Sequence, residues 1–263
     1  AGKIDEGRTL ILALTESFQG KAPEWRRLDT RRAWGELGLL YMRETRYPEA
    51  ADAFWNARSW QDCAYVLERL LTVDELLDWL SDHADARRYE DPYDRMDAGA
   101  LTARRLMRDA RFELALELFQ NEVRADAEKY IQSMQSAHNH GNAAATRARH
   151  FWNAARTMRD TGMQLFGSEL APDHAWVSGN YDWGDLGKQR QQVRWTPDYQ
   201  INAVTRREID RNQATRIEPN KRCHYRYRAV QLAELAAGLL PNNDENAARI
   251  YLVSASWIQK RDP

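Results

Sequence analysis

Hydrophobic positions recur every three or four residues along most of the chain, which is the spacing of an α-helix with one buried face. Residues 31–64 show this most clearly and contain two such stripes. The break between them contains Pro48, and a helix tolerates proline in its first turn. The pattern predicts two helices joined by a short turn, with these residues on their facing sides: Trp34, Leu37, Gly38 and Tyr41 on the first helix, and Tyr47, Ala50, Phe54 and Ala57 on the second.

The sizes of these side chains suit a helical hairpin. Gly38 and Ala50 are small where two helices have to approach closely, whereas Trp34, Tyr41 and Phe54 are large enough to fill the remaining space. The order and spacing resemble the tetratricopeptide repeat, a helical hairpin of about 34 residues with Trp, Leu-Gly and Tyr followed by Ala, Phe and Ala. The proline that usually closes this repeat is missing, so we expect the second helix to end differently.

Two further hairpins are predicted downstream. Residues 96–122 carry Ala103 at the small position of the first helix and Leu106 at the tyrosine position, and Phe112, Ala115 and Phe119 complete the pattern. Ala50 and Ala115 are about two repeat periods apart, which leaves room for one degenerate repeat between them. We expect its helices over residues 60–71 and 73–83, with Trp79 or Leu80 as the large residue.

The rest of the chain is also mostly helical in pattern. We expect a helix that precedes the first repeat and stops at Gly20, and others over residues 142–166, 196–210, 221–240 and 243–259. In the last pair, Leu235 and Leu239 are expected to face Ala248, Leu252 and Ala255. The predicted fold is all-α: a tetratricopeptide-like superhelix with hairpins over residues 1–137 and continuing helical repeats over 138–263. No polar capping helix follows Trp257, so another chain or a missing segment is expected to cover that end.

One stretch, residues 168–195, lacks helical periodicity and is long for a bare connection. Two interpretations are open: its aromatic side chains pack as core under a folded loop, or they form a recognition loop for a sugar ring or a peptide. The residues concerned are Trp176, Tyr181, Asp182, Trp183, Asp185 and Trp195.

Composition excludes several classes of protein. Ten Trp, eleven Tyr and six Phe exceed what a disordered chain carries. The formal net charge of -1 gives no general attraction to nucleic acid, and no stretch is long and apolar enough to span a membrane. Two buried, reduced thiols are favoured for Cys63 and Cys223 over one long-range bridge. The chain starts without Met, which fits a processed protein or a piece of a longer one, so a cytoplasmic and a periplasmic location both stay open.

No pattern predicts catalysis, a cofactor or a metal. The chain has no glycine-rich phosphate loop and no nucleophile elbow. His138, His140 and His150 fall one ligand short of a zinc site, and the calcium-like Asn180, Asp182 and Gly184 are followed by Gln191 where an acidic residue is required.

The family resemblance implies that the first helix of each repeat lines a groove for an extended peptide or a partner helix. Arginine pairs with carboxylates and methionine adapts to apolar shapes, so the residues at these positions favour an acidic or amphipathic partner. They are Arg32, Leu39, Met42 and Arg43 in the first repeat and Arg104, Met107 and Arg108 in the third. We therefore expect a noncatalytic protein-interaction scaffold or subunit of a larger assembly. The alternatives are a superhelical accessory domain of a larger enzyme, such as a cell-wall lytic transglycosylase, and glycan binding through the 168–195 loop.

Overall fold

A computed structural model describes residues 2–17, 24–87, 97–167 and 204–259. Every regular element in these ranges is a helix, and none of these residues forms a strand, which confirms the all-α prediction. The chain divides into two compact units: unit 1 contains Ala1–Ala98 and Asn180–Arg216, and unit 2 contains Gly99–Gly179 and Ile217–Pro263. Neither unit begins or ends at residue 137, where the predicted hairpins are separated from the continuing repeats.

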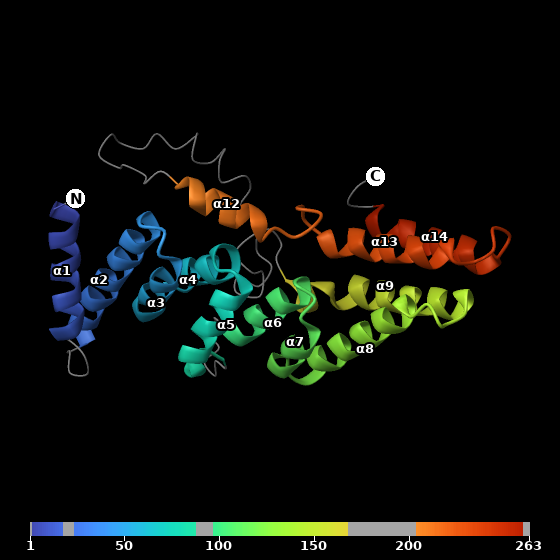
Figure 1. Ribbon diagram of the computed structural model, residues 1–263, viewed down its shortest axis with the longest axis horizontal. Helices are drawn as coiled ribbons and strands as arrows, with labels where there is room; N and C mark the ends of the chain where they lie inside the picture. The colour runs from blue at the N-terminus through green and yellow to red at the C-terminus, as the bar shows by residue number, and fades with distance from the viewer. Residues whose placement is uncertain (1, 18–23, 88–96, 168–203, 260–263) are drawn as a thin grey trace. The chain divides into compact units, whose positions relative to one another are not determined.

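Unit 1 contains helical hairpins from the first part of the chain and one helix that returns to them from much later (Figure 1). Its elements are α1 (Gly2–Ser17), α2 (Glu24–Arg43), α3 (Tyr47–Ala57), α4 (Trp60–Tyr65), the π-helical turn η1 (Val66–Leu70), α5 (Val73–Asp82), the 3-10 turn η2 (Ala84–Arg87) and α12 (Arg206–Ala214).

The hairpin of α2 and α3 is the one that the sequence predicts. The chain reverses at Thr45, which has a φ of 60°, and Pro48 lies in the first turn of α3. Gly38 makes the close approach possible, because a Cβ at that position would lie 2.6 Å from the ring of Phe54. Phe54 is buried and Ala50 is completely so. Gly38, Ala50 and Phe54 thus lie at the close approach expected of them, whereas Trp34 and Tyr41 are only half-buried.

The next hairpin, α4 with η1 followed by α5, also lies where it is expected. Thr72 caps the N-terminus of α5: its hydroxyl accepts from the Glu75 backbone N–H at 3.2 Å, and the Glu75 carboxylate accepts from the Thr72 N–H at 2.7 Å. This reciprocal pair satisfies two backbone donors that the helix itself leaves open. Trp79 and Leu80 are both buried, so the two candidates for the large residue share the role.

Unit 2 contains the remaining helices. They are α6 (Ala98–Arg108), α7 (Phe112–Leu118), α8 (Asn121–His138), α9 (Ala144–Phe166), α13 (His224–Gly238) and α14 (Glu245–Ile258). Within this unit α9 packs against α8 on one side and α13 on the other, and α13 packs against α14 (Figure 1). The approach of α9 to α13 is close, because a Cβ at Gly162 would lie 2.7 Å from the Cβ of Tyr225.

Two predictions about helices need correction, and one observed helix has no predicted counterpart. The helix expected over residues 196–210 begins, in the described part of the chain, only at Arg206, because the Thr205 hydroxyl caps it by accepting from the Glu208 N–H. Helix α8 has no counterpart among the individually predicted helices. Helix α8 spans Asn121–His138, and its sequence is largely polar with only a few buried residues, so its helical pattern is weak.

The last helical pair packs through other residues than expected. Leu235 and Leu252 are 52% and 75% exposed. The buried stripes consist of small residues and a few large ones: Ala229, Leu232, Ala233, Ala236 and Ala237 on α13, and Ala247, Ile250, Ser254 and Trp257 on α14. Alanines let helix backbones approach closely, and this outweighs the larger apolar area of the leucines.

Candidate binding surface on helix α9

The predicted groove residues differ in exposure between α2 and α6. On α2, Arg32, Leu39 and Arg43 are exposed, and Met42 is half-buried. On α6, Arg104 and Met107 are only 6% and 2% exposed. The Arg108 guanidinium donates to the Phe166 carbonyl at 3.0 Å.

The expectation that Arg104 and Met107 line an open groove is therefore wrong. Every residue from Leu101 to Met107 is buried, so this part of α6 presents no open groove wall. The candidate residues of the 168–195 loop, from Trp176 to Trp195, lie outside the described residues.

A cleft of about 690 Å³ lies between α9 and α14 within unit 2. The two helices run in the same direction, with α13 packed against both (Figure 1). The cleft has a mixed lining: alanines, a tryptophan and branched aliphatic side chains beside arginines and amides. The lining residues are Ala145, Ala148, Arg149, Trp152 and Arg156 of α9, Leu240 and Asp244 before α14, and Asn246, Arg249, Ile250 and Val253 of α14.

Trp152 gives this cleft a fixed aromatic wall. Its ring stacks on Trp257 of α14, with centroids 5.4 Å apart and planes 12° from parallel. The Trp257 carbonyl in turn accepts from Arg226 of α13 at 3.1 Å. Trp152 is only half-buried, so part of its ring is available to a ligand.

Three arginines make the cleft cationic. Arg149, Arg156 and Arg249 are exposed, and none of them has a hydrogen bond or an ion pair with another residue in the described part of the chain. The one carboxylate in the lining, Asp244, is occupied as the N-cap of α14, where it accepts from the Asn246 backbone N–H at 2.7 Å and from its side chain at 2.9 Å. Such a lining can pair with carboxylates while it covers an apolar side chain.

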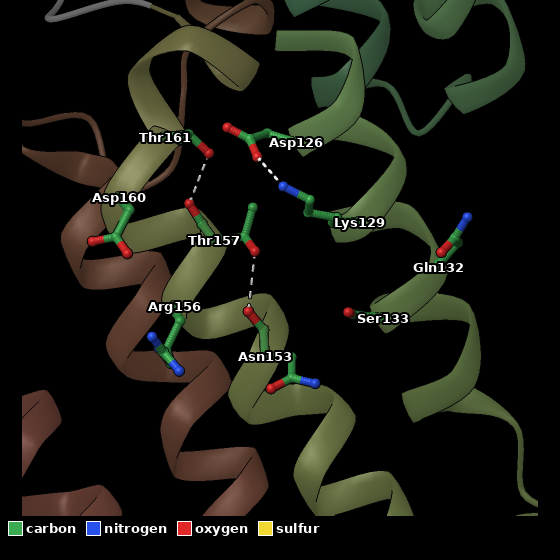
Figure 2. A pocket seen from close by; sticks show the side chains of 9 residues that line it. All are labelled: Asp126, Lys129, Gln132, Ser133, Asn153, Arg156, Thr157, Asp160 and Thr161. Carbon is green, nitrogen blue, oxygen red and sulfur yellow. Dashed lines mark hydrogen bonds and ion pairs between the residues drawn. The ribbon is translucent and has the colours of Figure 1, made fainter. Parts of the chain in front are cut away.

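A second hollow, of about 380 Å³, lies on the other side of α9, against α8. Figure 2 shows that its lining is polar throughout. The lining residues are Asp126, Lys129, Gln132 and Ser133 of α8 and Asn153, Arg156, Thr157, Asp160 and Thr161 of α9. Arg156 therefore borders both hollows.

Apart from Arg156, the charged residues that line this polar pocket each have an ion-pair partner. Lys129 binds Asp126 at 3.0 Å (Figure 2), and Asp160 is bound at 2.9 Å by Arg159, which lies outside the lining. The hydroxyls of Thr157 and Thr161 donate to carbonyls of their own helix, at 3.2 and 3.0 Å.

The neutral side chains of Gln132, Ser133 and Asn153 have no hydrogen-bond partner among the described residues. The pocket thus combines compensated charge with unused neutral donors and acceptors.

A cluster in unit 1 superficially resembles catalytic machinery. The Asp52 carboxylate accepts from Trp79 Nε1 at 2.7 Å and lies 3.4 Å from His83 Nε2, while His83 Nδ1 lies 2.9 Å from the Trp79 carbonyl. Desolvation by burial raises the pKa of Asp52, against the opposing charge of His83.

The nearby thiol does not complete a nucleophilic site. Cys63 is completely buried, its Sγ lies 3.6 Å from the Ala51 carbonyl, and burial raises its pKa well above the ordinary value. A thiol that stays protonated and inaccessible is a poor nucleophile, so we interpret the Asp52 cluster as a connection between α3 and α5.

The described ranges contain no group of three or more His, Cys, Asp or Glu side chains arranged to hold a metal ion. Cys63 and Cys223 are both buried free thiols, which confirms that prediction. No helix in the described part of the chain has the length and apolar character needed to cross a bilayer.

No protein-family model, curated protein or solved structure matches this chain.

Proposed function

We propose that this chain is a noncatalytic, tetratricopeptide-like interaction protein whose cleft between α9 and α14 binds an acidic, amphipathic segment of a partner protein. The observation that carries the proposal is the set of three arginines without described partners, Arg149, Arg156 and Arg249, around a lining of alanine, tryptophan, isoleucine and valine. Arginine binds carboxylates through paired hydrogen bonds, and a cleft with aromatic and aliphatic walls holds a leucine or an aromatic anchor.

The size of the cleft supports a peptide as ligand. About 690 Å³ lies within the range of typical ligand sites and has room for more than one side chain. Nucleic acid fits less well, because alanine, tryptophan and branched aliphatic side chains lie among the arginines of the lining and the chain as a whole carries a formal charge of -1.

The proposed site departs from the family expectation in one respect. The cleft lies between the second helices of two successive hairpins, α8 with α9 and α13 with α14, whereas the resemblance implies a ligand on first helices. The proposed partner is still the acidic, amphipathic segment that the sequence favours, but it binds in the cleft between α9 and α14.

An unbiased selection tests this proposal. A display library of random peptides of about twelve residues is selected on the purified chain, and the enriched sequences are remade and their affinities measured by isothermal titration. We expect enrichment of Asp and Glu around a Leu, Phe or Trp, and a loss of affinity at higher salt. Failure to enrich acidic peptides, or enrichment of basic ones, would overturn the proposal, as would preferential binding of a single-stranded oligonucleotide.

Charge-reversal variants locate the binding site. Arg149→Glu and Arg249→Glu together are expected to weaken the selected peptides at least about tenfold, since each lost charged hydrogen bond costs roughly 1.5 kcal/mol or more. Arg124→Glu is the matched control: this arginine is on α8 of the same unit but outside both hollows, and its substitution loses only an exposed pair with Glu128 of the same helix. Equal effects of the control and the cleft variants would place the binding elsewhere.

A further inference from the structure

We infer that the polar pocket between α8 and α9 is a second subsite, which binds the main chain of the same partner segment where it continues past Arg156. This inference rests on the proposed function and adds a direction and a mode of recognition to it.

The position of Arg156 connects the two subsites. On α9, the cleft is lined by residues up to Arg156 and the pocket by residues from Asn153 to Thr161, with Arg156 in both linings. Eleven positions along a helix, from Arg149 to Asp160, correspond to about 16 Å, which about five residues of an extended peptide span. A segment of ordinary length can therefore contact both subsites at once.

The chemistry of the pocket favours a neutral, hydrogen-bonding ligand. Asp126 is paired with Lys129 and Asp160 with Arg159, and the remaining charge in the lining, Arg156, also borders the cleft, where the proposed function assigns it to a carboxylate of the partner. Beyond Arg156 the pocket therefore offers little net charge to attract an ion. A phosphate or a further carboxylate would meet both aspartates. An apolar side chain would meet amides and hydroxyls, which lose hydrogen bonds with water when they are covered without replacement.

A peptide main chain fits these groups. The carboxamides of Gln132 and Asn153 each offer an acceptor and a two-hydrogen donor, which match the N–H and C=O groups of an extended chain. In Figure 2 Asn153 comes from α9 and Gln132 from α8, with Ser133 of α8 between them. The amides of Gln132 and Asn153 can thus bind the main chain of a peptide that passes between α8 and α9, whatever side chains the peptide carries.

Extension of a selected peptide tests this inference. About five glycine or alanine residues are added to either end, and a second version carries N-methyl groups on the added amides. We expect the extension at one end to improve affinity about fivefold, in line with one or two net hydrogen bonds, and N-methylation to abolish the gain. The gain should disappear in the double variant Gln132→Ala, Asn153→Ala, while the unextended peptide binds it unchanged.

Gln135→Ala is the matched control, because Gln135 is an exposed glutamine on α8 outside the pocket lining. If extension at neither end helps, or if N-methylated extensions help equally, the inference is overturned while the cleft proposal stands. If the double variant also weakens the unextended peptide, the pocket is part of the anchor site, which likewise contradicts the inference.

A measurement without the selected peptides separates the two proposals. The side-chain amide signals of Gln132 and Asn153, assigned by substitution, are followed by NMR during titration with N-acetyl-tetraglycine amide at millimolar concentration. We expect both signals to shift and that of Gln135 to stay in place. If both signals shift but the display selection yields no acidic peptide, the subsite is upheld and the cleft proposal is rejected. If the signals do not shift, the subsite is rejected.

Discussion

The Arg211 guanidinium donates two hydrogen bonds to the Glu75 carboxylate, at 2.5 and 3.1 Å, although 136 residues separate them in the chain. The same carboxylate accepts from the Thr72 N–H and so also caps α5. The Glu75 side chain thus links the start of α5 to α12, which lies much later in the sequence.

Other contacts support this attachment of α12 to unit 1. Glu208 accepts from the Tyr65 hydroxyl at 3.0 Å, and the Thr215 hydroxyl donates to the Arg69 carbonyl at 2.9 Å. The burial of Tyr65 and the adjacent Glu208 raise the pKa of Tyr65 to about 12, so the phenol remains a donor at any physiological pH.

We predict that Glu75→Gln weakens the attachment of α12. Glutamine keeps an acceptor for the Thr72 N–H but loses the charged pair with Arg211, at a cost of about 1 kcal/mol, between the values for exposed and buried charged pairs. Hydrogen exchange of the α12 amides should accelerate about fivefold. Arg206→Ala is the control, because it breaks only the exposed pair with Asp210 in the same helix and should leave exchange at the helix centre nearly unchanged.

The same attachment should depend on pH. Partial burial acts to raise the pKa of Glu75, but the hydrogen bonds from Arg211 and the Thr72 backbone outweigh burial, and the pKa is lowered. The resulting stability is present above the ordinary pKa of a glutamate and is lost as pH falls through the lowered one. Protection of α12, corrected for the intrinsic exchange rate, should therefore decrease on acidification in the native chain. An equal decrease in the Glu75→Gln variant would contradict this assignment.

Gly38→Ala should destabilise the α2–α3 hairpin by about 1–3 kcal/mol, the usual cost of overpacking a core. The added methyl would overlap the buried Phe54 ring, from which it would be 2.6 Å away. The loss of unfolding free energy is measured by urea titration, with hydrogen exchange of the α2 and α3 amides as the readout. Phe54→Leu in the same chain should restore part of it; a double variant less stable than both single ones would refute the steric explanation.

Cys63 should resist alkylation in the folded chain. The thiol is completely buried and its pKa is raised, so little thiolate forms and reagents cannot reach it. Mass spectrometry after iodoacetamide treatment at mildly alkaline pH should find Cys63 unmodified until denaturant is added. Rapid labelling in native buffer would show that the α3–α4 packing opens.

The sequence determined those features that depend on neighbours along the chain. The turn before Pro48, the Gly38–Phe54 approach and the α4–α5 hairpin follow from helical spacing, proline chemistry and side-chain size, all of which act within about one hairpin. The end of α9 at Gly167 follows similarly, because its φ of 67° is one that glycine adopts easily.

Only the tertiary structure decided which helical faces meet across long separations. Leu235 and Leu252 have the spacing of core residues, yet alanine stripes are buried instead, because close backbone approach depends on both partners at once. Arg104 and Met107 match groove positions by register, but the packing around α6 covers them. The half-exposed stack of Trp152 on Trp257, and with it the arginine-lined cleft, requires α9 and α14 to lie side by side, which no local pattern specifies.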